Sequence, residues 1–328
     1  MDIILPAKLQ KGDEVRIVAP SLSYKIISNE IRELATQRLV ERGLKVSFGK
    51  NVEICNQFTS SSILERVSDI HDAFSDKKVK AIFSVIGGYN SNELLPHLDY
   101  NLIKNNPKFL IGYSDTTTLL NAIHAKTGLV TYYGPSFSTL GMKKGAEYIL
   151  SDLDKTLFED KTISYAPSQK WSDDSWFLDQ ENRTFYNNEG PIVINPGIAK
   201  GFLMGGEMTT FQLLIGTSYL PVLDDIVLML EITDISSENS LKIINRLIYS
   251  LTQQPFFKNV KGIIFGRFEH SLNIDLREFS DLIKGNECLK NIPIIGNVDF
   301  GHTFPMTTLP IGKEISISTT EQQVKISY

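Results

Sequence analysis

Apolar positions recur with two different periods along the first half of the chain. Short apolar runs predict five strands, at 15–20, 44–49, 79–88, 109–114 and 129–135. Apolar residues spaced three or four positions apart predict four helices, at 29–43, 61–76, 92–99 and 116–128. Alternation of this kind implies parallel strands joined by crossover helices, so the first half is predicted to be an α/β unit.

The same two periods return in the last third of the chain. Apolar runs predict three strands, at 225–234, 260–268 and 292–302, and helical spacing predicts helices at 239–254 and 276–284. The segment FLMGGEMTTFQLLIGT, residues 202–217, predicts a loop followed by a helix, and residues 314–328 predict a terminal hairpin. The sequence therefore predicts a second α/β unit.

The two units are separated by a polar, aromatic and loop-rich segment at about 160–197. It contains both tryptophans of the chain, Trp171 and Trp176. Long loops are usually functional or disordered, and linkers seldom carry two tryptophans. We expect an ordered functional loop here, and three parts: 1–160, 161–197 and 198–328.

Composition and charge narrow the class of protein. With 42% hydrophobic and 22% charged residues the chain is typical of a globular protein, and its net charge of −5 argues against nucleic acid or an anionic membrane as partner. Cys55 and Cys288 are distant and form no metal-binding motif, and the five histidines are scattered, so no metal or cofactor is expected. There is no signal-peptide pattern and no apolar run long enough to cross a membrane, so we expect a cytoplasmic protein.

Three predicted strands end in residues that could carry chemistry. They end at Ser114, Glu231 and His302. Ligands of open α/β sheets gather at the carboxyl ends of the strands. A serine hydroxyl becomes a useful nucleophile when an imidazole takes its proton, and a carboxylate orients that imidazole.

Each of these residues has a plainer interpretation. Ser114 could cap the helix that follows it, Glu231 could pair with a cation, and His302 could bond to backbone. Asp234 and Asp299 compete with Glu231 for the role of orienting carboxylate. Spacing alone does not decide between them.

The glycine pair in VIGGYNSNE, residues 85–93, is a second signal. Backbone that turns at Gly87 and Gly88 can present bare N–H groups, and with the N–H of Asp115 these would form an oxyanion hole. The alternative is a tight turn into a helix. A nucleotide-binding loop is disfavoured because the chain has no G-x-G-x-x-G pattern.

Several segments in order along nearly the whole chain resemble the serine peptidases of the LD-carboxypeptidase family. They are VRIVAPS, VIGGYNSNELLPHLD, GYSDTTTLLNAIHAKTGLVTYYGP, LEITD and DFGHTFPMTTLPIG. The tryptophan-bearing insert WSDDSWFLDQ and the chain length are most similar to the branch of microcin C self-immunity proteins.

This resemblance implies a fold, a site and a substrate class. The fold would be an N-terminal Rossmann-like domain and a C-terminal mixed α/β domain with the active site at their junction. The catalytic triad would be Ser114, Glu231 and His302, with the oxyanion bound by the N–H groups of Gly88 and Asp115.

The same resemblance implies that an aromatic side chain of the insert stacks on the substrate's nucleobase, and either Trp171 or Trp176 could do so. The activity would be that of a metal-free serine carboxypeptidase acting on peptidyl-nucleotide conjugates, and the family resemblance favours a homodimer.

Two alternative functions remain. One is removal of terminal D-Ala from a murein tetrapeptide, and the other is nucleotide or sugar binding without hydrolysis. Tryptophan in the insert favours cleavage of the peptidyl-nucleotide conjugate, because a bare D-Ala offers no flat ring to stack upon.

Overall fold

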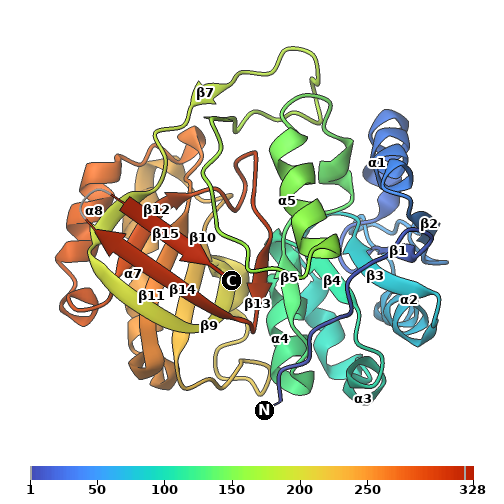
Figure 1. Ribbon diagram of the computed structural model, residues 1–328, viewed down its shortest axis with the longest axis horizontal. Coiled ribbons are helices and arrows are strands. Elements are labelled where there is room, and N and C mark those ends of the chain that lie inside the picture. The colour runs from blue at the N-terminus through green and yellow to red at the C-terminus, as the bar shows by residue number, and fades with distance from the viewer. Residues whose placement is uncertain (1, 321–322) are drawn as a thin grey trace.

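The computed structural model describes residues 2–320 and 323–328 and contains two large sheets side by side (Figure 1). The strands of the first unit are β1 (Glu14–Val18), β2 (Lys45–Phe48), β3 (Val79–Ser84), β4 (Phe109–Gly112) and β5 (Thr131–Tyr133). Its α-helices are α1 (Asn29–Glu41), α2 (Ile63–Ser75), α3 (Tyr100–Lys104), α4 (Thr117–Thr127) and α5 (Glu147–Phe158). Two short 3₁₀ helices, Ser91–His97 and Ser114–Thr116, follow the ends of β3 and β4.

The N-terminal sheet has the strand order β13-β5-β4-β3-β1-β2. Strands β1 to β5 are parallel to one another, as the alternation of strands and helices predicted, and β13 pairs antiparallel with β5. The central strands β3 and β4 are almost entirely buried, which explains their continuous apolar runs. Helix α2 begins at a capping box in which Ser62 and Glu65 exchange hydrogen bonds, so the start of that helix is encoded locally.

The C-terminal sheet has the order β15-β14-β9-β10-β11-β12-β8. Its strands are β8 (Ile192–Asn195), β9 (Gly197–Glu207), β10 (Ile226–Glu231), β11 (Val260–Gly266), β12 (Ile294–Val298), β14 (Glu314–Thr320) and β15 (Gln323–Ser327). The helices of this part are α6 (Met208–Gln212), α7 (Ser240–Thr252) and α8 (Leu276–Lys284). Strands β9 to β12 are parallel and the other three pair antiparallel, so the sheet is mixed. The predicted two-part α/β fold is confirmed.

Two details differ from the sequence prediction, and a third lies outside the described residues. Residues 202–207 were predicted as a loop, but they form the end of strand β9. Glycines at 205 and 206 suggested a loop, whereas here they let β9 run close to other backbone: a Cβ at Gly205 would lie 2.0 Å from the Met229 carbonyl oxygen. The insert also contains the short strands β6 (Lys170–Trp171) and β7 (Tyr186–Asn187). The terminal hairpin is confirmed as a β14–β15 pair, and its turn at 321–322 lies outside the described residues.

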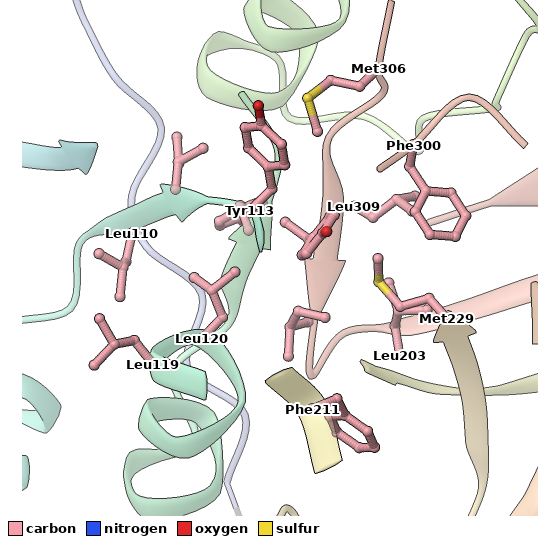
Figure 2. Close-up of a cluster of buried hydrophobic side chains, with 14 of the residues drawn as sticks. Leu110, Tyr113, Leu119, Leu120, Leu203, Phe211, Met229, Phe300, Met306 and Leu309 are labelled. Atoms are coloured by element: carbon pink, nitrogen blue, oxygen red, sulfur yellow. The ribbon is translucent and has the colours of Figure 1, made fainter. Parts of the chain in front are cut away.

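The two units are joined by a strand of the C-terminal part that adds to the N-terminal sheet, as well as by side-chain packing. Strand β13 (Leu309–Ile311) comes from the last part of the chain but pairs with β5 in the N-terminal sheet (Figure 1). Leu309 lies between Leu120 of α4 and Met229 of β10 in the buried cluster at this junction (Figure 2). Residues near the strand ends of both units are therefore held together by a common core.

The buried side chain of Asn121 on α4 adds a polar link across the same junction. Its amide donates to the Gly205 carbonyl at 2.8 Å and accepts from the Gly205 N–H at 3.1 Å. None of the helices in the described chain is long and apolar enough to cross a bilayer. The domain boundaries at 160 and 197 stay a prediction.

Candidate active site

Ser114 stands at a sharp turn between β4 and α4. Its φ of 60° places it in the left-handed region, which is unusual for a residue with a side chain and is a form of backbone strain found at functional sites. Within the described chain the Ser114 hydroxyl caps neither the 3₁₀ helix that it begins nor α4. The geometry therefore disfavours the helix-cap interpretation and matches that of a nucleophile elbow.

Glu231 and His302 meet at the edge of the C-terminal sheet. Glu231 ends β10 with its side chain buried, and its Oε2 lies 3.0 Å from Nδ1 of His302. Among the described residues neither competing carboxylate bonds to His302: Asp299 forms a buried ion pair with Arg267, and Asp234 is an exposed residue of the cavity wall. Of the three candidates, Glu231 is the one that the structure brings to His302.

The loop after β3 packs directly on Ser114. A Cβ added at Gly87 would lie 2.9 Å from the Ser114 hydroxyl oxygen, so a side chain larger than hydrogen would collide with it. Within the described chain, neither the Gly88 N–H nor the Asp115 N–H donates a hydrogen bond to protein. Both amides are thus free to receive an anionic oxygen formed beside Ser114.

The carboxylate of Asp115 joins this loop to the serine turn. It accepts hydrogen bonds from the N–H groups of Asn90 and Ser91 at 3.0 and 2.9 Å, and the Ser91 hydroxyl donates to the Asp115 carbonyl. Asp115 is buried. The backbone that carries one proposed oxyanion donor is therefore tied to the residue that carries the other.

Ser114 and His302 line one cavity of about 640 Å³. Gly87, Gly88, Tyr113 and Glu269 lie in the same wall. The Ser114 hydroxyl makes no hydrogen bond to His302 among the described residues. The cavity thus brings together Ser114, His302 and Gly88, and Glu231 lies behind the imidazole.

The electrostatics of the cavity favour a protonated histidine in the free protein. Burial lowers the pKa of His302. The charge of Glu231 and its hydrogen bond raise this pKa by more than burial lowers it, and the charges of Glu269 and Glu207 add to the increase. The net effect raises the pKa of His302 to about 9. Burial raises the pKa of both Glu269 and Glu207. His302 is thus kept charged until the pH rises or a substrate changes its surroundings.

The structure separates the two tryptophans of the insert. Trp176 lines the cavity and packs edge-on against Phe304, with a ring-centroid separation of 6.2 Å. Trp171 is not among the residues found to line it. Its ring stacks on His270 at 4.6 Å and lies 5.0 Å from the Arg267 guanidinium, so both neighbours hold it in the loop.

Sequence reasoning missed three kinds of residue in and behind the cavity. Phe177 and Leu178 are exposed apolar side chains in its wall, and Glu269 adds a carboxylate. Tyr133 lies behind the cavity, and its hydroxyl donates to Glu231 Oε1. Tyr133 ends β5, so the rule that singled out Ser114 and Glu231 at strand ends would also have found it. No group of three or more histidine, cysteine or acidic residues placed to bind a metal occurs in the described chain.

Family models match both units of the chain. The LD-carboxypeptidase N-terminal domain matches residues 15–134 and the LD-carboxypeptidase C-terminal domain matches residues 200–317. YocD of Bacillus subtilis, which carries a carboxypeptidase name, is 47% identical over 93% of both chains. The crystal structure of an MccF-like protein from Bacillus anthracis is 48% identical, covers 99% of this chain and 98% of its own, and superposes with a TM-score of 0.97.

More distant relatives have names that specify a substrate. The microcin C7 self-immunity protein MccF of Escherichia coli is 30% identical over 99% of this chain and 96% of its own. A structure of MccF with glutamyl sulfamoyl guanosine has a TM-score of 0.86 at 29% identity, and covers 98% of this chain and 97% of its own. The murein tetrapeptide carboxypeptidase of Pseudomonas aeruginosa is 31% identical over 39% of this chain and 41% of its own. The chain belongs to the LD-carboxypeptidase family of serine peptidases, near MccF.

Proposed function

We propose that Ser114, His302 and Glu231 form the catalytic triad of a serine carboxypeptidase. His302 takes the proton of the Ser114 hydroxyl as the serine oxygen attacks the carbonyl carbon of the scissile amide. The carbonyl oxygen becomes an anion that the N–H groups of Gly88 and Asp115 stabilise. The observation that carries this proposal is the contact between His302 and Glu231 beside a cavity in which Ser114 has a φ of 60°.

The remaining steps use the same groups. The tetrahedral intermediate collapses, the C–N bond breaks, and His302 gives its proton to the departing nitrogen, which leaves an ester on Ser114. Water then attacks this ester while His302 accepts its proton, and the serine hydroxyl is restored as the acid product leaves. Glu231 stabilises the imidazolium throughout.

The proposed substrate is a conjugate in which an aminoacyl or peptidyl unit is joined through an amide to a nucleotide-like group. Relatives named MccF bind aminoacyl sulfamoyl nucleosides, and such a group has a flat base that an apolar wall can cover. Here the wall is built from Trp176, Phe177, Leu178 and Phe304. The physiological role would be detoxification of microcin C-type conjugates.

A murein tetrapeptide is the second candidate, since one relative bears that name. Its terminal D-Ala carries a free carboxylate. The residues found to line the cavity include no lysine or arginine, so protonated His302 is the cationic side chain there that could meet this carboxylate. The apolar wall of the cavity supports the conjugate as the first candidate, because D-Ala has no flat ring for that wall to cover.

The experiment that tests the proposed function is mass spectrometry of products formed from both candidate substrates. Wild-type protein should release the nucleotide-like group from the conjugate faster than it releases D-Ala from the tetrapeptide. Faster release of D-Ala would reverse the order of the two candidates. Binding of the conjugate without any product would favour a non-hydrolytic binding protein.

We further propose that the protein acts in the cytoplasm as a homodimer. The proposal is supported by membership of the LD-carboxypeptidase family. Light scattering after size-exclusion chromatography should give twice the 36.9 kDa chain mass. A single-chain mass over the working concentration range would contradict the dimer.

A further inference from the structure

Tyr133 is the last residue of β5 and lies behind the proposed triad with its ring fully buried. The rings of Tyr113 and Phe300 pack against it at centroid distances of 6.3 and 6.4 Å. A Cβ at Gly206 would lie 3.0 Å from Tyr133 Cε2, so β9 presses closely on the ring. Elements of both units therefore fix the position of this side chain.

The Tyr133 hydroxyl connects the serine turn with the acidic residue. It donates a hydrogen bond to Glu231 Oε1 and accepts one from the Ser114 backbone N–H at 3.4 Å. Burial and the charge of Glu231 raise the pKa of Tyr133 well above its usual value, so the hydroxyl keeps its proton and remains a donor.

The Glu231 carboxylate depends on this hydroxyl because few other donors reach it. Its side chain is 1% exposed, which removes it from bulk water. Among the described residues its hydrogen-bond partners are Tyr133 at Oε1 and His302 at Oε2. A buried carboxylate with one oxygen left unbonded is costly, and among the described residues no other hydrogen bond would then hold Oε1 while Oε2 faces the imidazole.

We propose that Tyr133 is a positioning residue of the reaction, holding Glu231 in the orientation in which Oε2 faces His302 and tying that carboxylate to the backbone of Ser114. This inference rests on the proposed function, because it assigns a role within the same triad. Tyr133 is not among the residues that line the cavity, so it acts through Glu231 and Ser114 rather than on the substrate.

Tyr133→Phe tests the proposal by removing a single oxygen atom. Loss of the hydrogen bond from Tyr133 to the charged Glu231 should lower kcat by roughly ten- to a hundredfold and leave KM nearly unchanged. Without the second donor, the charge of Glu231 acts more strongly on the imidazole. The pKa of His302 should therefore rise, and the rising limb of the pH–rate profile should move to higher pH.

Tyr132→Phe is the matched control. Tyr132 precedes Tyr133 on β5, is also buried, and packs against Phe109 at 4.9 Å. Its hydroxyl has no hydrogen-bond partner in the described part of the chain. The control should keep wild-type kcat and pH profile, whatever its effect on thermal stability.

Titration of His302 by NMR in the substrate-free protein gives a readout that does not need activity. The signal is assigned with His302→Gln. A higher His302 pKa in Tyr133→Phe, but not in Tyr132→Phe, supports the proposal even if neither substrate candidate is cleaved. Such a lack of cleavage would contradict the proposed function instead.

Two results would overturn the role of Tyr133. One is an unchanged His302 titration together with a wild-type kcat in Tyr133→Phe. The other is an equal loss of kcat in Tyr133→Phe and Tyr132→Phe, which would indicate a general packing effect of β5.

Discussion

His302 and Glu231 are proposed to act as one unit, and the pH dependence of the reaction should show this. A protonated imidazole cannot accept the serine proton, so kcat/KM should rise with pH as His302 loses its proton. Because the pKa of His302 is raised to about 9, the rising limb should lie well above the neutral region where an ordinary histidine titrates.

Glu231→Gln tests the cause of this shift. The substitution keeps the size of the side chain but removes the charge that favours the imidazolium, so the pKa of His302 should fall and the rising limb should move to lower pH. The rate should drop by roughly a thousandfold or more, because the charge no longer stabilises the imidazolium in the transition state. Asp234→Asn serves as control. A wild-type rate and profile in Glu231→Gln would point to another carboxylate.

The link between the glycine loop and the serine turn should depend on the Asp115 side chain. In Asp115→Ala the N–H groups of Asn90 and Ser91 lose their acceptor, so the loop that carries the Gly88 N–H should shift. We expect kcat to fall by roughly a hundredfold, as for loss of an oxyanion donor, with a smaller change in KM.

Asp115→Asn provides the conservative comparison, because its amide oxygen can still accept both hydrogen bonds. It should recover most of the lost rate. If Asp115→Ala retains wild-type kcat, or if Asp115→Asn is equally impaired, the side chain does not position the loop in this way.

The insert should influence substrate choice through Trp176. Stacking of an aromatic side chain on a base contributes about 1–3 kcal/mol. Trp176→Ala should therefore lower kcat/KM for the nucleotide conjugate by roughly ten- to a hundredfold, and barely change hydrolysis of a small L,D-peptide.

Trp171→Ala is the control, since that ring packs between His270 and Arg267. It should lower the melting temperature while keeping the ratio of the two specificity constants. Equal losses on both substrates in Trp176→Ala, with a lower melting temperature, would refute base stacking and favour the murein peptide.

The elements with a clear period were predictable from the sequence. The parallel strands and amphipathic helices of both units lie close to the expected positions because local spacing encodes them. The end of β9 was not predictable, because glycines such as Gly205 and Gly206 are typical of loops. A strand there is explained by the close approach of these two glycines to Met229 and Tyr133. The pairing of β13 with β5 was also not predictable, because the sequence of a three-residue strand does not indicate which strand it pairs with.

The candidate site was predictable only where a strand-end rule applied. That rule selected Ser114, Glu231 and His302, and the structure brings Glu231 to His302 and places Ser114 in the same cavity. Which tryptophan faces the cavity depends on how the insert folds against Phe304 and His270. No local pattern encodes such long-range contacts.

At the scale of the whole molecule, the site requires both units to stay docked, because Ser114 belongs to one unit and Glu231 and His302 to the other. Asn121→Ala removes the buried amide that bonds to both the N–H and the carbonyl of Gly205. The free energy of unfolding should fall by about 2–4 kcal/mol, since buried polar groups of β9 lose partners.

Urea denaturation measures this change, with Asn101→Ala on the exposed surface of α3 as control. Activity of Asn121→Ala should fall at temperatures below its main unfolding transition, because loosening of the junction separates the serine from its base. Stability equal to that of the control would show that Asn121 does not hold the two units together.

The central claim is that Ser114 is the nucleophile, and covalent labelling tests it most directly. Wild-type protein treated with a serine-reactive phosphonate should gain one adduct by intact-mass analysis, and peptide mapping should place it on Ser114. Ser114→Ala should take up no label and should lose activity by several orders of magnitude. An adduct of equal yield in Ser114→Ala, with turnover retained, would contradict the account.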